Sequence, residues 1–302
     1  MIRPLLNVYK NRRRQRVIRR AFGQCDPHWV TVIGGANALR VDPEDNRVRK
    51  ILLYNIARGR AKTNQVFWQD AAAAMEPTVV LDIGLNYGEC LFTPTYPAGA
   101  QLHGFEANPS LIPYLNETIA AHPNRDAITL YGNAVSDASG QTLHLAISQQ
   151  SSGISHLTGA AASNTVAVQS VRIDDIIARP TASDRLLVKL DIEGAEPLAL
   201  AGMPDTLAAA GTTMVFMEFS AEMLADRGHD VPAFWALLCE RFTIHVCSRT
   251  GEATPLAACD WADVPRSLKS THCDLILTIG DDPRIDTFLT RWRTRDAQRA
   301  AA

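Results

Sequence analysis

The chain has 302 residues, of which 46% are hydrophobic and 21% are charged, and this balance is typical of one large α/β domain with extensions. The formal net charge of −2, without a basic stripe that carries interleaved aromatics, argues against a general nucleic-acid binder. No run approaches 18 apolar residues, so no membrane-spanning helix is expected. The six cysteines form no Cys-x-x-Cys or Cys/His cluster, which argues against zinc and favours a reducing, cytoplasmic location.

Residues 1–75 form the predicted N-terminal extension, a helical and β segment that begins with a basic helix. Lys10 and six arginines fall between positions 10 and 20. We interpret this cluster first as the solvated face of a helix; the alternatives are contact with an anionic membrane surface, an anionic substrate or an acidic partner. A small β-element over 30–41 and a helix near 47–58 are expected to follow.

The main domain is predicted over 76–285, and it opens with the most informative motif of the chain. Residues 79–83 are an apolar strand that carries Asp82 and leads into a turn with Gly84 and Gly88, which lets the backbone approach a ligand. Position 86 is Asn, so the Gly-x-Gly-x-x-Gly signal of a dinucleotide site is absent. The Asp82 carboxylate instead favours a ligand that is cationic or donates hydrogen bonds, such as the amino group of an aminoacyl-type cofactor.

A second acidic residue ends the next predicted strand, 102–106. Glu106 lies 18 positions after Gly88, near the offset at which an acidic side chain meets ribose hydroxyls in nucleotide-binding βαβ units. Asp82 and Glu106 together therefore predict a nucleotide-like cofactor. The alternative is that the two carboxylates only cap strand ends.

The rest of the domain alternates strands and helices. Further strands are predicted near 128–131, 186–191, 213–218, 243–247 and 273–279, and helices near 88–95, 109–121, 195–202 and 231–241. This order predicts a doubly wound, mostly parallel sheet. A β-insertion of about 138–178 separates the third and fourth core strands, and its Ser/Gly-rich segment 148–163 is interpreted as a mobile loop over the site. Residues 286–302 are predicted to be a charged C-terminal tail.

Three carboxylates follow the fourth and fifth core strands. Asp191 and Glu193 belong to the segment KLDIEGAE, and Glu218 belongs to FMEF. Because ligands bind at the carboxyl edge of open α/β sheets, these side chains are expected to converge there. They could supply a general base or bind a divalent ion that acidifies a hydroxyl, and we favour the version without metal. Alternatively, Glu193 caps the next helix. His156, in the Ser/Gly-rich loop, is a further candidate base.

The ordered motifs LDIGLNYG, FEANP, NAVSD, VRIDDI, KLDIEGAE and FMEF resemble those of the S-adenosylmethionine-dependent methyltransferases of the FkbM family. The resemblance covers about residues 30–220. It implies a Rossmann-like class I methyltransferase fold with an antiparallel last strand, S-adenosylmethionine as cofactor and S-adenosylhomocysteine as product. The acceptors it implies are hydroxyls of sugars, glycolipids or natural products, and we therefore expect an O-methyltransferase.

The motifs give the following candidate site residues. The cofactor is expected to contact Asp82, Ile83, Gly84, Asn86, Gly88, Glu106, Ala107, Asn133, Ala134 and Asp191, and catalysis is assigned to Glu193, Glu218 and His156. Two other functions stay open: a non-catalytic cofactor-binding or scaffold protein of the same fold, and an NAD-dependent oxidoreductase, which the absent glycine disfavours. The sequence names neither the acceptor nor the oligomeric state.

Overall fold

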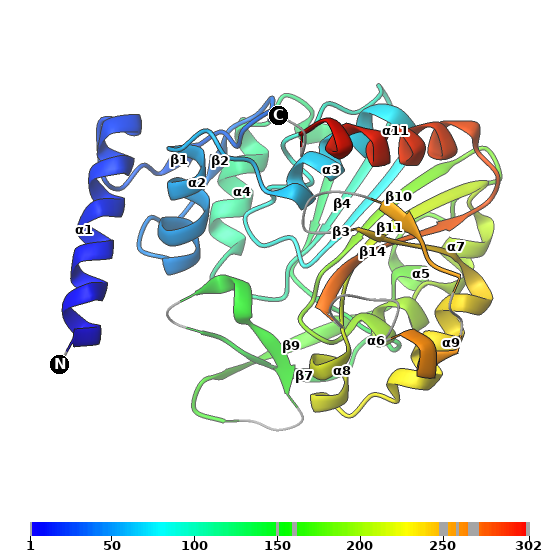
Figure 1. Ribbon diagram of the computed structural model, residues 1–302. Helices are drawn as coiled ribbons and strands as arrows, with labels where there is room; N and C mark the ends of the chain where they lie inside the picture. The colour runs from blue at the N-terminus through cyan, green and yellow to red at the C-terminus, as the bar shows by residue number, and fades with distance from the viewer. Residues whose placement is uncertain are drawn as a thin grey trace.

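A mixed eight-stranded sheet forms the centre of the molecule in the computed structural model, which describes residues 2–148, 151–158, 162–247, 253–257, 260–264 and 272–299 (Figure 1). The strand order is β13-β12-β14-β11-β10-β3-β4-β5. The parallel strands are β3 (Val79–Ile83), β4 (Gln101–Phe105), β5 (Ile128–Tyr131), β10 (Arg185–Leu190) and β11 (Thr212–Ser220). The strand β14 (His272–Ile279) is antiparallel to both of its neighbours, β11 and β12 (Thr243–Cys247), and the edge strand is β13 (Ala253–Pro255). The predicted doubly wound sheet and its antiparallel last strand are therefore confirmed.

Helices cover both faces of the sheet because its central strands are apolar on both sides. In β3, Val80 belongs to the core on one face and Leu81 to the core on the other. The first face is covered by α3 (Thr63–Met75), α4 (Ile112–Ala121) and α11 (Pro283–Arg299). The second is covered by α5 (Ile173–Ile176), α6 (Glu196–Ala201), α7 (Pro204–Ala209), α8 (Ala221–Asp226) and α9 (Val231–Arg241). Short 3-10 turns lie at Arg125–Ala127 and Trp261–Asp263.

The helix α11 includes the beginning of the predicted C-terminal tail. The rings of Phe288 and Trp292 pack against Phe67 of α3, with centroid distances of 5.3 and 5.2 Å. Both side chains are buried. This part of α11 is therefore a component of the core.

The helix predicted near 88–95 does not form, and that prediction is wrong. The segment makes successive turns, in which the Phe92 amide donates to the Gly88 carbonyl at 3.0 Å. Pro94 has no amide hydrogen and restrains the residue before it from the helical region, so the first turn is not continued. The turns still serve the site because they bring the Leu91 amide to the Asp82 carboxylate.

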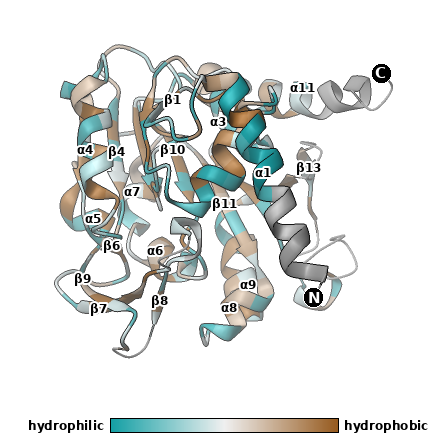
Figure 2. Cartoon of the chain, turned by 90° about the vertical axis from the view of Figure 1, so that its left-hand side faces the viewer, coloured by the Kyte–Doolittle hydropathy of each residue, from teal (hydrophilic) through white to brown (hydrophobic). Residues whose placement is uncertain are grey.

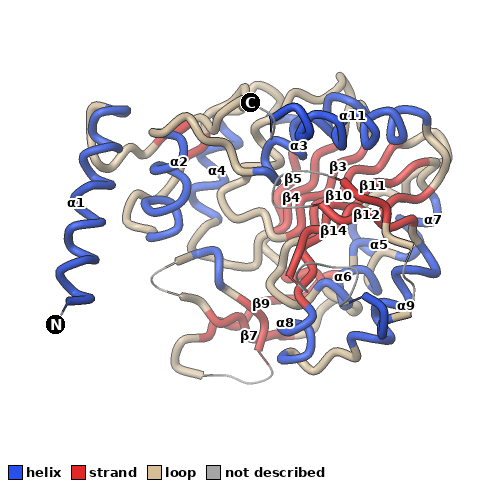
Figure 3. Tube along the Cα trace, viewed as in Figure 1, coloured by secondary structure: helices blue, strands red, loops and turns tan. Residues whose placement is uncertain are grey.

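A second sheet lies beside the carboxyl ends of β3 to β5 (Figure 3). Its order is β6 (Ala134–Val135), β9 (Thr165–Val171), β7 (Thr142–Ala146) and β8 (His156–Thr158). All four strands come from the chain between β5 and β10. A 3-10 turn at Ser152–Ile154 precedes β8.

The N-terminal segment packs on the edge of the domain. It comprises α1 (Ile2–Phe22), the two-stranded sheet of β1 (Trp29–Val30) and β2 (Leu39–Arg40), a π-helical stretch at Val48–Leu53 and α2 (Tyr54–Ile56). Ile18 of α1 is fully buried, and the Arg14 guanidinium lies 5.7 Å from the centroid of the Tyr54 ring. In Figure 2, much of the ribbon of α1 that is not grey has hydrophilic colouring. No helix in the described ranges is long and apolar enough to cross a membrane.

Candidate active site

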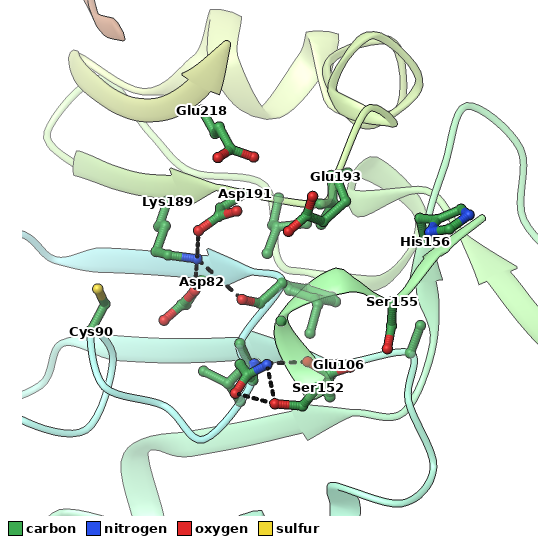
Figure 4. A pocket seen from close by; sticks show the side chains of 18 of the residues that line it. Asp82, Cys90, Glu106, Ser152, Ser155, His156, Lys189, Asp191, Glu193 and Glu218 are labelled. Atoms are coloured by element: carbon green, nitrogen blue, oxygen red, sulfur yellow. Dashed lines mark hydrogen bonds and ion pairs between the residues drawn. The ribbon is translucent and has the colours of Figure 1, made fainter. Parts of the chain in front are cut away.

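A pocket of about 340 Å³ opens at the carboxyl ends of β3, β4, β10 and β11 (Figure 4). Twelve of the thirteen predicted site residues line it, namely Asp82, Ile83, Gly84, Asn86, Glu106, Ala107, Asn133, Ala134, His156, Asp191, Glu193 and Glu218. The exception is Gly88. The sheet edge thus brings together residues that lie more than 130 positions apart in the sequence.

The two glycines of the first turn have different roles. Both have a left-handed backbone, with φ of 85° at Gly84 and 80° at Gly88. A Cβ at Gly84 would lie 2.0 Å from the Asp191 carbonyl oxygen, so glycine allows the first loop to approach the loop after β10. A Cβ at Gly88 would lie 2.1 Å from the Phe92 ring. Gly88 therefore serves the packing beneath the loop and does not face the pocket.

A lysine that the sequence interpretation overlooked holds two of the acidic residues. The ammonium nitrogen of Lys189 lies 3.4 Å from Asp82 Oδ1, 3.4 Å from Asp191 Oδ2 and 3.1 Å from the Gly84 carbonyl oxygen. Burial raises the pKa of Asp82 to about 6, although Lys189 partly offsets this effect. Burial also opposes the charge on Lys189, but the carboxylates of Asp191 and Asp82 raise its pKa above the usual range. The Asp82–Lys189–Asp191 group therefore fixes the first loop against the loop after β10.

Glu106 uses both carboxylate oxygens to hold backbone. Oε2 accepts the Asn86 amide at 2.7 Å, and Oε1 accepts the Asn108 amide at 2.8 Å. Burial raises the pKa of Glu106 to about 7, and these amide bonds partly offset the rise. Since Asn86 has a left-handed φ of 53°, the bond from Glu106 stabilises a conformation that a non-glycine residue rarely adopts. Glu106 thus shapes the first loop as well as lining the pocket.

Asn86 also connects the first loop to the second sheet. Its Nδ2 donates to Ser152 Oγ at 3.1 Å, and the Ser152 amide lies 3.3 Å from Asp45 Oδ2. The Tyr87 hydroxyl donates to the same Asp45 oxygen at 3.2 Å. Three segments that are distant in the sequence therefore meet at one wall of the pocket.

The expected adenine side of the pocket is formed by short strand ends. Asn133 donates through Nδ2 to the Gln169 carbonyl at 3.3 Å, and Ala134 is buried on β6. Ile83 is buried at the end of β3, and Ala107 follows β4. These four residues offer mostly backbone and apolar surface to a ligand.

The three predicted carboxylates, Asp191, Glu193 and Glu218, converge near the ends of β10 and β11, away from the expected adenine side of the pocket. Asp191, Glu193 and Glu218 each place a carboxylate oxygen within 4.8 Å of the others. Burial and the neighbouring carboxylates, first Glu218, raise the pKa of Glu193 to about 8. Glu218 Oε1 lies 3.2 Å from His272 Nε2, and burial followed by the charge of Asp191 raises the pKa of Glu218. Such a group can take up a proton, bind donors on a ligand or coordinate a hard divalent cation.

His156 reaches the same region from the second sheet. It begins β8, where its backbone pairs with Ala146 of β7, and its ring lies on the Glu193 side of the pocket (Figure 4). The predicted site residues therefore come from both sheets.

Three further charged residues line the pocket, and sequence analysis did not identify them. Arg47 and Glu89 form a buried ion pair at 2.5 Å, and Lys62 lies directly before α3. Arg47 and Lys62 precede the first core strand, outside the motifs that mark the sheet edge. Only Lys189 had a local signal, since a lysine inside the apolar strand 185–190 needs an acidic partner.

The fold and the site define a Rossmann-like class I S-adenosylmethionine-dependent methyltransferase. The chain belongs to the FkbM family, since the family model described as "Methyltransferase FkbM domain" matches residues 82–243, more than half of its length. This match also removes the NAD-dependent alternative. No curated protein matches the sequence.

Solved structures of methyltransferases are similar to the chain at low sequence identity. An O-methyltransferase from Bacillus cereus in complex with S-adenosylhomocysteine is 11% identical, with a TM-score of 0.43, and the match covers 79% of this chain and 92% of that one. The FkbM methyltransferase from Methylobacillus flagellatus KT is 13% identical, with a TM-score of 0.38 and coverage of 90% and 60%. The O-methyltransferase TomG from Streptomyces achromogenes, involved in tomaymycin synthesis, is 11% identical, with a TM-score of 0.39 and coverage of 72% and 79%.

Proposed function

We propose that this methyltransferase acts on a hydroxyl oxygen of a sugar, a glycolipid or a natural product. The observation that supports this most is the group of three carboxylates, Asp191, Glu193 and Glu218, at one end of the pocket. Carboxylates that crowd together in a half-buried site are costly unless a proton, a cation or a donor-rich ligand relieves them. A polyhydroxylated acceptor carries many such donors.

Glu193 is the best candidate for the general base. Its pKa of about 8 lies close to neutral pH, where a base combines an available unprotonated form with a useful affinity for the proton. Bound S-adenosylmethionine supplies an electrophilic methyl group on a sulfonium. The Glu193 carboxylate takes the acceptor proton as the oxygen forms its bond to the methyl carbon, and the carbon–sulfur bond breaks with its electron pair left on sulfur. Glu218 and His156 are assigned to positioning of the acceptor.

The cofactor is proposed to bind across the first loop and the ends of β4 and β5. Asp82, Ile83, Gly84 and Asn86 would surround the methionine and ribose, with Glu106 and Ala107 at the ribose and Asn133 with Ala134 at the adenine. Asp191 is placed near the methionine end. This placement is supported by the chemistry of the pocket, which has acidic groups for the methionine ammonium and apolar strand ends for the adenine.

The same three carboxylates could bind a divalent cation, and we favour metal-free catalysis. The ion pair of Lys189 with Asp191 already supplies a positive charge at this end. Chelator treatment distinguishes the two versions, because loss of activity with restoration by Mg²⁺ would show that a metal is required.

The test of this function uses the methyl group itself. The protein is incubated with S-adenosylmethionine labelled in its methyl group and with pools of glycans, glycolipids and small hydroxylated metabolites, and labelled products are identified by mass. Labelled methyl ethers in the presence of wild type, and their absence with Glu193→Gln, are expected. Label found only on nitrogen would contradict the proposal. Binding of the cofactor without transfer to any pool would favour the non-catalytic alternative.

We also propose a division of the chain into an extension (1–75), a catalytic domain (76–285) with an insertion (138–178) and a C-terminal segment (286–302). Segment 148–163 of the insertion is assigned as a lid, of which residues 148, 151–158 and 162–163 lie within the described ranges. Hydrogen exchange should slow there when cofactor is added. Equal protection with and without cofactor would contradict a lid.

The cytoplasmic location of the protein stays a prediction.

The basic face of α1 is proposed to contact an anionic surface. Five arginines are exposed on its described part, Arg12, Arg13, Arg16, Arg19 and Arg20. All 32 acidic residues of the chain come after residue 22, whereas eight of the 30 basic ones come before it. Binding to vesicles with anionic lipids should therefore weaken as salt rises and be lost on changing these arginines to glutamine. Binding that is indifferent to salt would contradict the proposal.

A further inference from the structure

One positively charged side chain of the pocket, Lys62, has no direct ion-pair partner among the described residues. Lys62 lines the pocket immediately before α3, with an extended backbone (φ −77°, ψ 145°). Among the described residues, no carboxylate lies within 4.0 Å of its ammonium nitrogen, in contrast to the other pocket cations, Arg47 and Lys189. Burial, followed by the charge of Arg47, lowers the pKa of Lys62, and the more weakly acting carboxylates of Glu89 and Asp191 only partly offset this effect. A cation in such a place is costly unless a ligand supplies an anion.

Lys62, Arg47 and Glu89 together carry one excess positive charge in the pocket lining. Arg47 and Glu89 form a close ion pair, so they largely neutralise one another. The first turn of α3, whose Asn64 and Gln65 also line the pocket, contains no acidic residue. The group of Asp82, Lys189 and Asp191, which lines the same pocket, has the opposite balance, two carboxylates to one ammonium. The pocket is therefore bipolar.

An amino-acid zwitterion matches this bipolar arrangement. It carries a carboxylate and an ammonium on one carbon, and the methionine part of S-adenosylmethionine is such a group. We propose that Lys62 binds the methionine carboxylate of the cofactor, an inference that rests on the proposed cofactor site. With this role, Lys62 is a cofactor contact from the N-terminal segment, which lies outside the motifs that mark the sheet edge.

A cofactor that lacks only the carboxylate tests this assignment. Affinities for S-adenosylmethionine and for decarboxylated S-adenosylmethionine are measured by calorimetry on wild type, Lys62→Met, Lys62→Arg and a control, Lys50→Met, whose side chain is exposed and does not line the pocket. Wild type should prefer the intact cofactor by about 10- to 100-fold, the range for a charge-assisted hydrogen bond. Lys62→Met should lose this preference and bind the decarboxylated compound as wild type does, while Lys62→Arg keeps part of it.

The outcomes separate the two proposals. Wild type that fails to bind S-adenosylmethionine would contradict the proposed function itself. If wild type binds S-adenosylmethionine but Lys62→Met prefers it over the decarboxylated compound as strongly as wild type does, only the role of Lys62 is overturned. The anion that pairs with Lys62 would then be part of the acceptor. If Lys62→Met loses the same affinity for both compounds, the assignment is also overturned, because Lys62 would then support the fold or the nucleoside site. Thermal unfolding of each variant shows whether it is folded.

Discussion

The two ends of the pocket differ in how their acidic side chains are satisfied. At the β3–β4 end, Asp82 and Glu106 accept backbone amides at 2.7 to 3.1 Å, and Asp82 Oδ1, which accepts no hydrogen bond, forms an ion pair with Lys189. At the β10–β11 end, the Glu193 carboxylate accepts no hydrogen bond from the described residues, and one buried oxygen of Glu218 has none either. The first end has its geometry before any ligand binds, whereas the second depends on a proton or a ligand. This difference agrees with the proposed roles, cofactor binding at the first end and catalysis at the second.

The largest expected effect comes from breaking the connection between the two ends. Replacing Lys189 with Met leaves the buried Asp82 and the half-buried Asp191 without their shared cation. Loss of one partner of a buried ion pair costs about 3–5 kcal/mol, so the free energy of unfolding should fall by that amount in urea titration. Lys50→Met, at an exposed position, is the control. A loss below 1 kcal/mol would show that the two carboxylates are satisfied without the lysine.

Next in size is the effect at the reacting end. Glu193→Gln should lower methyl transfer roughly 10²-fold, the usual scale for removal of a general base, while S-adenosylhomocysteine affinity stays close to wild type. Glu218→Gln should also slow transfer. Glu240→Gln on the exposed part of α9 serves as control. If both pocket variants keep wild-type turnover, these residues are structural and His156 becomes the next candidate for the acceptor site.

At the holding end, Glu106→Ala should weaken S-adenosylhomocysteine binding. The change removes the acceptor for the Asn86 amide together with the expected ribose contact, and a charge-assisted hydrogen bond contributes roughly 1.5–3 kcal/mol. Calorimetry measures the loss. Exposed Glu117 provides a matched control. An unchanged affinity of Glu106→Ala for S-adenosylhomocysteine would contradict the ribose assignment.

The smallest expected effect is a pH dependence of stability in the ligand-free protein. Burial raises the pKa of Glu193 to about 8 and that of Glu106 to about 7, above the values near 4.5 expected in the unfolded chain. The folded state therefore binds more protons between about pH 4.5 and 8, and the free energy of unfolding falls as pH rises through this window. Glu193→Gln should make the decline shallower in its upper part. Stability that rises from pH 5 to 8 would contradict these pKa directions.

The sequence predicted those parts of the molecule that have a local cause. Strands β3 and β10 follow from apolar runs, and the convergence of Asp82, Glu106 and Asp191 follows from the common edge of parallel strands. The helix expected near 88–95 failed because Pro94 outweighs the apolar residues around it. The true contact of Gly88, the Phe92 ring, depends on that same misjudged segment.

Other parts could not be predicted because their causes are not local. Arg47 and Lys62 enter the pocket from a segment without a recognised motif, and the chain folds back over a long distance to place them. The Asn86–Ser152 hydrogen bond joins positions 66 residues apart. Such contacts are decided by the tertiary packing, which no spacing rule describes.

The contact of Ser152 with both Asn86 and Asp45 has a kinetic consequence. These hydrogen bonds join the turn before β8 to the proposed cofactor loop, so we expect the spent cofactor to leave only after they open. Residence time of S-adenosylhomocysteine is then governed by the strength of these hydrogen bonds, and turnover can be limited by release instead of by methyl transfer. Ser152→Ala, which keeps the backbone amide but loses the hydroxyl, should shorten the residence time in stopped-flow displacement, and an enzyme limited by release would run faster with these hydrogen bonds weakened.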